Sequence, residues 1–189
     1  MANRVIEIMN SKNPVKVLYD EHEIIISAIT VSKAAQKLIA DKPDVYEKVI
    51  IELIAFFRQF ADQYHHYKEE IILFPEMNKK NELLEDGVIK EMFNNHEEFR
   101  DMLAEIENCL NKKDYANTQV KLNNYCEALL DHIAVENDEV FQMAESLFNE
   151  DELEKIYFKF EDCDRDKGEL KKNELVMQLA KLKTLVENS

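Results

Sequence analysis

The residues of this sequence that could do chemistry are its histidines and the glutamates placed one helical turn from them. The chain has five histidines, and four of them fall on apolar stripes with the three-to-four-residue spacing of a helix. These four are His22, His65, His96 and His132. Glu69 follows His65 by four residues and Glu136 follows His132 by four, so each pair shares one helix face. An inward glutamate without a partner would be costly or forced neutral, so the pattern predicts buried cations among these six side chains.

His65 and His66 are adjacent, and their neighbours indicate which of them faces inward. The residues one and two turns from His65 are apolar, whereas those around His66 are mostly charged. We therefore predict that His65 faces the core and that His66 faces outward or lies behind the ligands. Paired with Glu70, His66 would form an outer contact or line a pocket mouth; the alternative is a solvated surface pair.

Prolines, a glycine and polar turn residues divide the sequence into long helices, and these helices must position the histidines and glutamates. Asn13-Pro14 is typical of a helix start, and further helices are expected over about 43–79, 89–110 and 114–148, with Pro75 bending or fraying the end of the second. Four helices with short connections favour an all-α, antiparallel up-down four-helix bundle over residues 14–148. In this bundle the six side chains lie within about one turn of a common level. A lone inward histidine is usually an ordinary core residue, but this convergence favours a metal site.

Residues 149–189 differ in sequence pattern from the bundle and are predicted to form a C-terminal helical extension. They suggest one short and one longer helix around the polar segment 161–168. Their apolar residues could cover an end of the bundle or mediate self-association or contact with a protein partner.

Composition excludes several classes of function. The chain has 24 Lys+Arg against 39 Asp+Glu, a net charge of −15, so nucleic acid and anionic membrane surfaces are poor partners. Two glycines and three prolines are too few for the turns of a sheet protein. No apolar run is long enough to span a bilayer or to resemble a secretory signal. Three scattered cysteines without a CxxC pair indicate a reducing compartment, and we expect a cytoplasmic protein.

The donor types indicate which metals would bind. Imidazole with carboxylate and no thiolate suits iron or manganese, with zinc possible. Six protein ligands are too many for one ion that keeps an open position. They fit two ions that share the two glutamates as bridges, each ion capped by two histidines. Such a centre leaves positions free for a small diatomic molecule or a peroxide, and no side chain needs to act as a nucleophile.

Four local motifs resemble those of the hemerythrin-like (HHE cation-binding) family. They are DEHEII around His22, HHYKEEIILFPEM around His65, NHEEFRDML around His96 and DHIAVENDEVF around His132. The resemblance covers about residues 14–148. It implies a four-helix bundle with a non-haem, carboxylate-bridged di-iron centre. The ligand positions fall on His22, His65, Glu69, His96, His132 and Glu136.

The chain departs from the oxygen-carrying hemerythrins that it resembles. Those proteins have a second histidine one turn after the third-helix ligand, where this chain has Arg100, and an Asp five residues after the last histidine, where this chain has Glu136 at four. The ligand set instead resembles the subgroup of iron–sulfur repair proteins and peroxide- or NO-reactive relatives. The repair proteins usually carry a cysteine-bearing N-terminal domain, whereas about 13 residues precede the bundle here.

The resemblance implies a protein that binds or reduces O₂, NO or peroxide. The alternative is an iron- or oxygen-sensing or iron-donating protein without repeated turnover. Tyr125, on the core stripe of the fourth helix, would either donate a hydrogen bond to a bound oxygen species or pack as an ordinary core residue.

Overall fold

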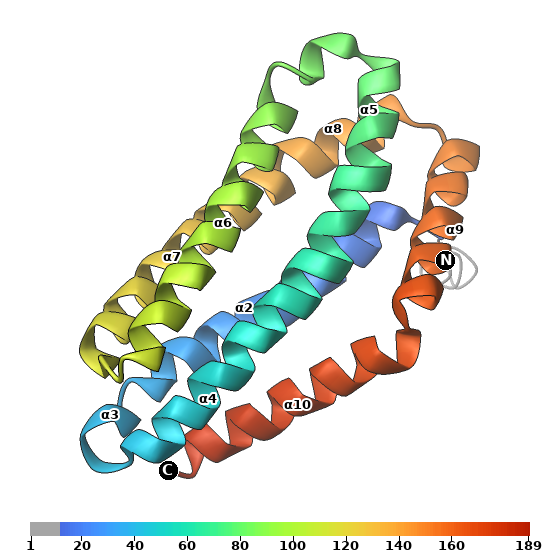
Figure 1. Ribbon diagram of the computed structural model, residues 1–189. Coiled ribbons are helices and arrows are strands. Elements are labelled where there is room, and N and C mark those ends of the chain that lie inside the picture. The colour runs from blue at the N-terminus through green and yellow to red at the C-terminus, as the bar shows by residue number, and fades with distance from the viewer. Residues whose placement is uncertain (1–11) are drawn as a thin grey trace.

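The computed structural model describes residues 12–189 and is built from long helices (Figure 1). The first rod of the bundle is α2 (Pro14–Ala35), and Asn13 caps it by accepting a 2.9 Å hydrogen bond from the Val15 amide to Oδ1. Each of the other three rods of the bundle is a long helix made of one or more segments. They are α4 (Pro43–Phe56), η1 (Phe57–His66), η2 (Glu69–Leu73) and α5 (Phe74–Lys80); then α6 (Val88–Asn111); then α7 (Tyr115–Val135), η4 (Glu136–Val140) and α8 (Phe141–Leu147). The short α3 (Leu38–Asp41) and η3 (Glu82–Leu84) lie in the connections. The predicted all-α four-helix bundle is confirmed.

Two of these rods contain π-helical segments. In η1 the backbone hydrogen bonds reach five residues back, as between the Tyr67 amide and the Asp62 carbonyl. Glu69 begins η2, and Glu136 begins η4. Pro75 is the second residue of α5, which continues the helix directly after η2. A π-helical turn holds more residues than an α-helical one, so it changes which side chains face the core.

The core of the bundle is divided by a layer of polar side chains. One apolar cluster includes Ile25 and Phe99, and a second includes Leu18 and Met92. His22 follows Leu18 by one turn and precedes Ile25, and His96 lies in the same way between Met92 and Phe99. The histidines therefore occupy a layer enclosed above and below by apolar packing.

The C-terminal residues form two helices, α9 (Glu150–Lys167) and α10 (Glu169–Glu187). α9 starts at a capping box formed by Asn149 and Glu152. The expectation of a short helix followed by a polar break over 161–168 is wrong, because α9 continues through Lys167 and ends at Gly168, whose φ is +103°. Figure 1 shows α10 returning along the bundle beside α4 and α2. The division into residues 14–148 and 149–189 stays a prediction.

The inward side of α10 shares the core of the bundle. Its apolar residues Leu175, Leu179, Leu182 and Val186 belong to the same cluster as residues of α4. Among the described helices, none combines the length and apolar character needed to cross a membrane.

Gly168 fixes the corner between α9 and α10, and we predict that Gly168→Ala destabilises the protein. A φ of +103° is a conformation that L side chains rarely adopt. The expected loss is about 1–2 kcal/mol in the free energy of unfolding, measured by urea denaturation. The exposed neighbour Glu169 provides the control, since Glu169→Ala should change stability by less than about 0.5 kcal/mol. Equal effects of the two substitutions would contradict the role given to the backbone at Gly168.

Candidate metal centre

The polar layer contains two adjacent groups of side chains that could each hold a metal ion. The three-histidine group comprises His66, His96 and His132. The mixed group comprises His22, His65, Glu69 and Glu136. Within each group one nitrogen or oxygen per residue lies within 4.8 Å of the others, and all seven residues are buried. The six residues predicted from the sequence are all present, and His66 is added to them.

The two glutamates lie between the groups. Glu136 Oε2 is 3.2 Å from His22 Nε2 and 3.2 Å from His132 Nε2, so this carboxylate faces one histidine of each group. Glu69 does the same, with Oε1 3.4 Å from His65 Nε2 and Oε2 3.8 Å from His96 Nε2. Both carboxylates are therefore placed to serve both groups.

The inward atoms of the site lack hydrogen-bond partners although they are buried. This holds for both oxygens of Glu69 and of Glu136, for Nε2 of His22 and of His65, and for both ring nitrogens of His66. Two further inward nitrogens, Nε2 of His96 and of His132, lie only 3.1 Å apart. Buried polar atoms in folded proteins are nearly always paired. Such a concentration of unpaired acceptor atoms fits bound cations, because a cation can pair with the carboxylate oxygens and with one nitrogen of each imidazole.

The outward nitrogens of three histidines have acceptors that fix the ring tautomers. His22 Nδ1 is 2.8 Å from Asn137 Oδ1, His65 Nδ1 is 3.1 Å from Glu21 Oε2, and His96 Nδ1 is 2.8 Å from Glu70 Oε1. In each case the Nδ1–H donates outward, which leaves Nε2 free to face the centre.

Burial keeps three of the imidazoles neutral, and the pKa values of the two glutamates shift in opposite directions. Burial lowers the pKa of His65, His66 and His96 to about 3 each. Burial and the charge of Glu136 raise the pKa of Glu69 well above its usual value. Burial also acts to raise the pKa of Glu136, but contacts with His132 and His22 outweigh it and lower that pKa. Neutral imidazole is the form that binds a metal.

The prediction that His66 faces outward is wrong. Its side chain is 2% exposed, and its ring stacks on that of His96 with centroids 3.8 Å apart. An α-helix turns by about 100° per residue, so two adjacent side chains cannot both point to the same centre. His66 ends the π-helical segment η1, where the wider turn brings the directions of His65 and His66 closer together.

The structure also locates the other two residues considered from the sequence. Glu70 lies behind His96, as described, and accepts a further 2.7 Å hydrogen bond from Arg100 Nη2. Tyr125 is buried and packs edge-on against Phe57 and Phe99, and Phe99 in turn contacts the ring of His132.

Sequence reasoning missed Glu21 and Asn137, the outward partners of His65 and His22. Glu21 is 3% exposed despite its charge. It lies three residues after Leu18 and four before Ile25, so the apolar spacing of α2 already placed it at the edge of the core. No comparable signal marks Asn137, since its role depends on η4.

The buried histidines are expected to make the metal-free protein lose stability in mild acid. His65, His66 and His96 have folded pKa values below the unfolded value of 6.5, so the unfolded chain binds more protons as the pH falls from 6.5 toward 3. Stability present above pH 6.5 is therefore lost by up to about 1.4 kcal/mol per pH unit for each histidine. Melting temperatures of the metal-free chain between pH 8 and 5 measure this slope. His66→Phe should reduce the slope by about one proton, and a flat profile down to pH 4.5 would contradict neutral burial.

A helical bundle that encloses convergent histidines and carboxylates on facing rods defines a metal-binding four-helix-bundle protein. Comparison with protein families gives the particular family. The model of the hemerythrin HHE cation binding domain matches residues 13–144, well over half of the 189-residue chain, and the chain belongs to this family. No curated protein and no solved structure gives a match.

Proposed function

We propose that the chain is a non-haem di-iron protein that binds or reduces a small oxidant such as O₂, NO or peroxide. The observation that carries this proposal is the set of seven buried donors in two adjacent groups, with two carboxylates facing both. Two groups favour two ions, and donors limited to nitrogen and oxygen favour iron, with manganese or zinc as competitors.

The residues divide naturally between the two ions. His66, His96 and His132 would hold one, His22 and His65 the other, and Glu69 and Glu136 would bridge them. Iron bound there would supply a change of oxidation state and an open position for a small ligand. Two bridging carboxylates would offset much of the added positive charge inside the bundle.

The protein contributes orientation and the exclusion of water. The hydrogen bonds from Nδ1 to Asn137, Glu21 and Glu70 hold three imidazole rings with Nε2 inward. Aromatic rings cover the outer faces: Phe141 stacks on His22 with centroids 5.2 Å apart, and Phe99 contacts His132 at 5.1 Å. Such an enclosure favours small, uncharged or weakly hydrated ligands over bulky substrates.

The cysteines and the net charge bear on where the protein acts and on what it binds. The free thiols of Cys109, Cys126 and Cys163 support a reducing compartment such as the cytoplasm. A net charge of −15 argues against nucleic acid as a partner.

Anaerobic loading with Fe²⁺ followed by stepwise addition of peroxide, or of an NO-releasing compound, tests the proposal. Consumption of many equivalents with return of the starting spectrum supports an oxidant-reducing enzyme. One stoichiometric spectral change supports a carrier or sensor, and iron transfer to an apo iron–sulfur acceptor supports an iron donor. Failure of the loaded protein to react with O₂, NO or peroxide would contradict the proposal.

A further inference from the structure

A buried carboxylate links one metal-facing histidine to the C-terminal helices. Glu21 lies on α2 and is 3% exposed. Its Oε2 accepts from His65 Nδ1 at 3.1 Å, and its Oε1 accepts from Lys68 Nζ and from Lys172 Nζ, each at 2.6 Å. Lys172 belongs to α10, 151 residues away along the chain.

Asp164 of α9 completes this cluster and balances its charge. Its carboxylate lies 2.6 Å from Lys68 Nζ and 2.5 Å from Lys172 Nζ. Two carboxylates and two ammonium groups thus cancel, which is the condition for burying them, since Lys68 is completely inaccessible. Half of the four charges come from α9 and α10, which meet at the Gly168 corner (Figure 1) and are called the C-terminal helix pair below.

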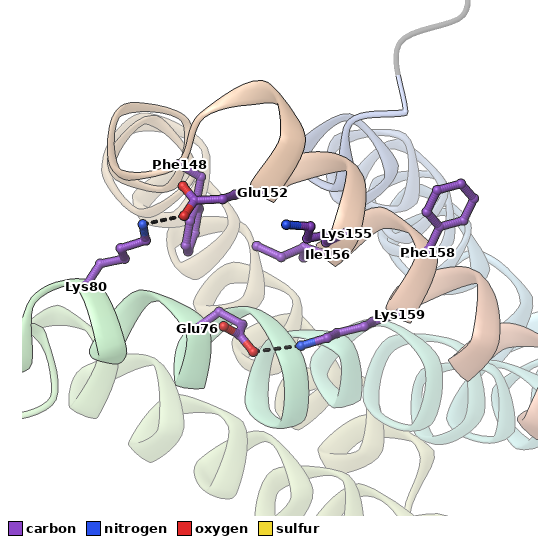
Figure 2. A pocket seen from close by; sticks show the side chains of 8 residues that line it. All are labelled: Glu76, Lys80, Phe148, Glu152, Lys155, Ile156, Phe158 and Lys159. Atoms are coloured by element: carbon purple, nitrogen blue, oxygen red, sulfur yellow. Dashed lines mark hydrogen bonds and ion pairs between the residues drawn. The ribbon is translucent and has the colours of Figure 1, made fainter.

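A second contact fixes the C-terminal helix pair beside the buried cluster. The hydroxyl of Tyr64, one residue before His65, donates to the carbonyl oxygens of Lys167 and Gly168 at 3.0 and 2.8 Å. By contrast, the outer half of α9 is joined to α5 by the ion pairs Lys80–Glu152 and Lys159–Glu76, which cross an open groove of about 460 Å³ (Figure 2). Exposed pairs of that kind contribute little to stability. The buried cluster is therefore the main polar contact that holds the C-terminal helix pair to the bundle.

We propose that the C-terminal helix pair is part of the metal centre. Through Lys172 and Asp164 it holds Glu21, and Glu21 positions His65. The affinity of the mixed group for its ion therefore depends on the docked helix pair. This inference rests on the proposed two-metal function. The three-histidine group has its own outer partners in Glu70 and Arg100, which lie on η2 and α6. The C-terminal helix pair therefore affects the binding of one ion and not of the other.

Two consequences follow from this arrangement. The loss of an outer carboxylate partner of a metal-bound histidine typically weakens metal binding ten- to a hundredfold. Because linkage between metal binding and helix docking is reciprocal, an ion in the mixed group must also stabilise the docked C-terminal helix pair. Metal occupancy of the bundle is thereby communicated to the surface of α10.

The first test titrates the full-length variants anaerobically with Co²⁺, whose visible absorption reports each binding step. Glu21→Gln should weaken one of the two ions ten- to a hundredfold, and Lys172→Met about tenfold, while the second ion keeps its affinity. Lys172→Arg should restore binding to within about threefold. Lys171→Met, which removes the exposed neighbouring charge, is the matched control and should change nothing. Glu70→Gln should weaken the other ion, so that Glu21→Gln and Glu70→Gln combined affect both.

The second test needs no variant. Amide hydrogen exchange in residues 175–186 of the wild-type chain should slow severalfold when both ions are bound. Equal weakening of both ions by Lys172→Met, no weakening of either, or unchanged exchange in α10 would overturn the inference. Two tight sites in the wild type together with any of these results would leave the proposed function intact, whereas a wild-type chain that binds no ion would overturn both.

Discussion

Glu69→Gln is expected to weaken both metal ions while making the metal-free chain more stable. Both oxygens of Glu69 are buried without hydrogen-bond partners, and they face one histidine of each group. In the absence of metal, burial and the charge of Glu136 raise the pKa of Glu69, so folding is penalised as the pH rises above the unfolded value of 4.5. Glutamine keeps the shape and cannot ionise, which removes that penalty.

The expected effects of Glu69→Gln have opposite signs and are measured separately. Metal analysis after loading with Fe²⁺ should show the loss of more than about 90% of bound iron, since a bridging ligand is worth more than an outer partner. The melting temperature of the metal-free variant at pH 8 should rise by several degrees, equivalent to about 1–2 kcal/mol. Glu139→Gln changes an exposed glutamate on the same rod as Glu136 and should alter neither quantity. A metal-free variant less stable than wild type would show that Glu69 is held by protein contacts and not by cations.

His66→Ala is expected to remove one of the two ions. The ring of His66 is buried against His96 with both nitrogens unpaired, and it supplies one of three donors in its group. We expect affinity for that ion to fall about a hundredfold and affinity for the ion of the mixed group to change much less, because His66 is not a member of that group.

Metal stoichiometry of purified variants checks the role of His66. His66→Ala should retain about one iron per chain, as should His96→Ala, whereas Gln63→Ala, at an exposed position on the same π-helical segment, should retain two. The α-helical interpretation of the sequence predicts the opposite result, with iron content unaffected by His66→Ala. Two irons in that variant would contradict the assignment of His66 as a metal ligand.

Most of the site could be predicted from the sequence because it depends on local spacing. His22 and His96 each continue an apolar stripe with Leu18 or Met92 one turn before, and the i,i+4 spacing of His65–Glu69 and His132–Glu136 survives in the folded chain. Asn13 and Pro14 likewise mark the start of α2 where the structure has it. These features need no information from distant segments.

Three features could not be predicted, for different physical reasons. The π-helical segment η1, which ends at His66, has no residue signature comparable to a cap or a proline. The Glu21–Lys172 contact joins residues 151 apart, so no periodicity within one helix encodes it. The polar segment 161–168 continues α9 through Lys167, and Asp164 within it enters the buried cluster, a contact that local composition does not encode.

Anomalous X-ray diffraction at the iron edge, from crystals of the Fe²⁺-loaded protein, tests the central claim most directly. We predict two peaks inside the bundle, one bounded by His66, His96 and His132 and the other by His22 and His65, with Glu69 and Glu136 between them. A single peak, peaks elsewhere on the chain, or no peak from protein saturated with iron would contradict the claim that two cations occupy the bundle.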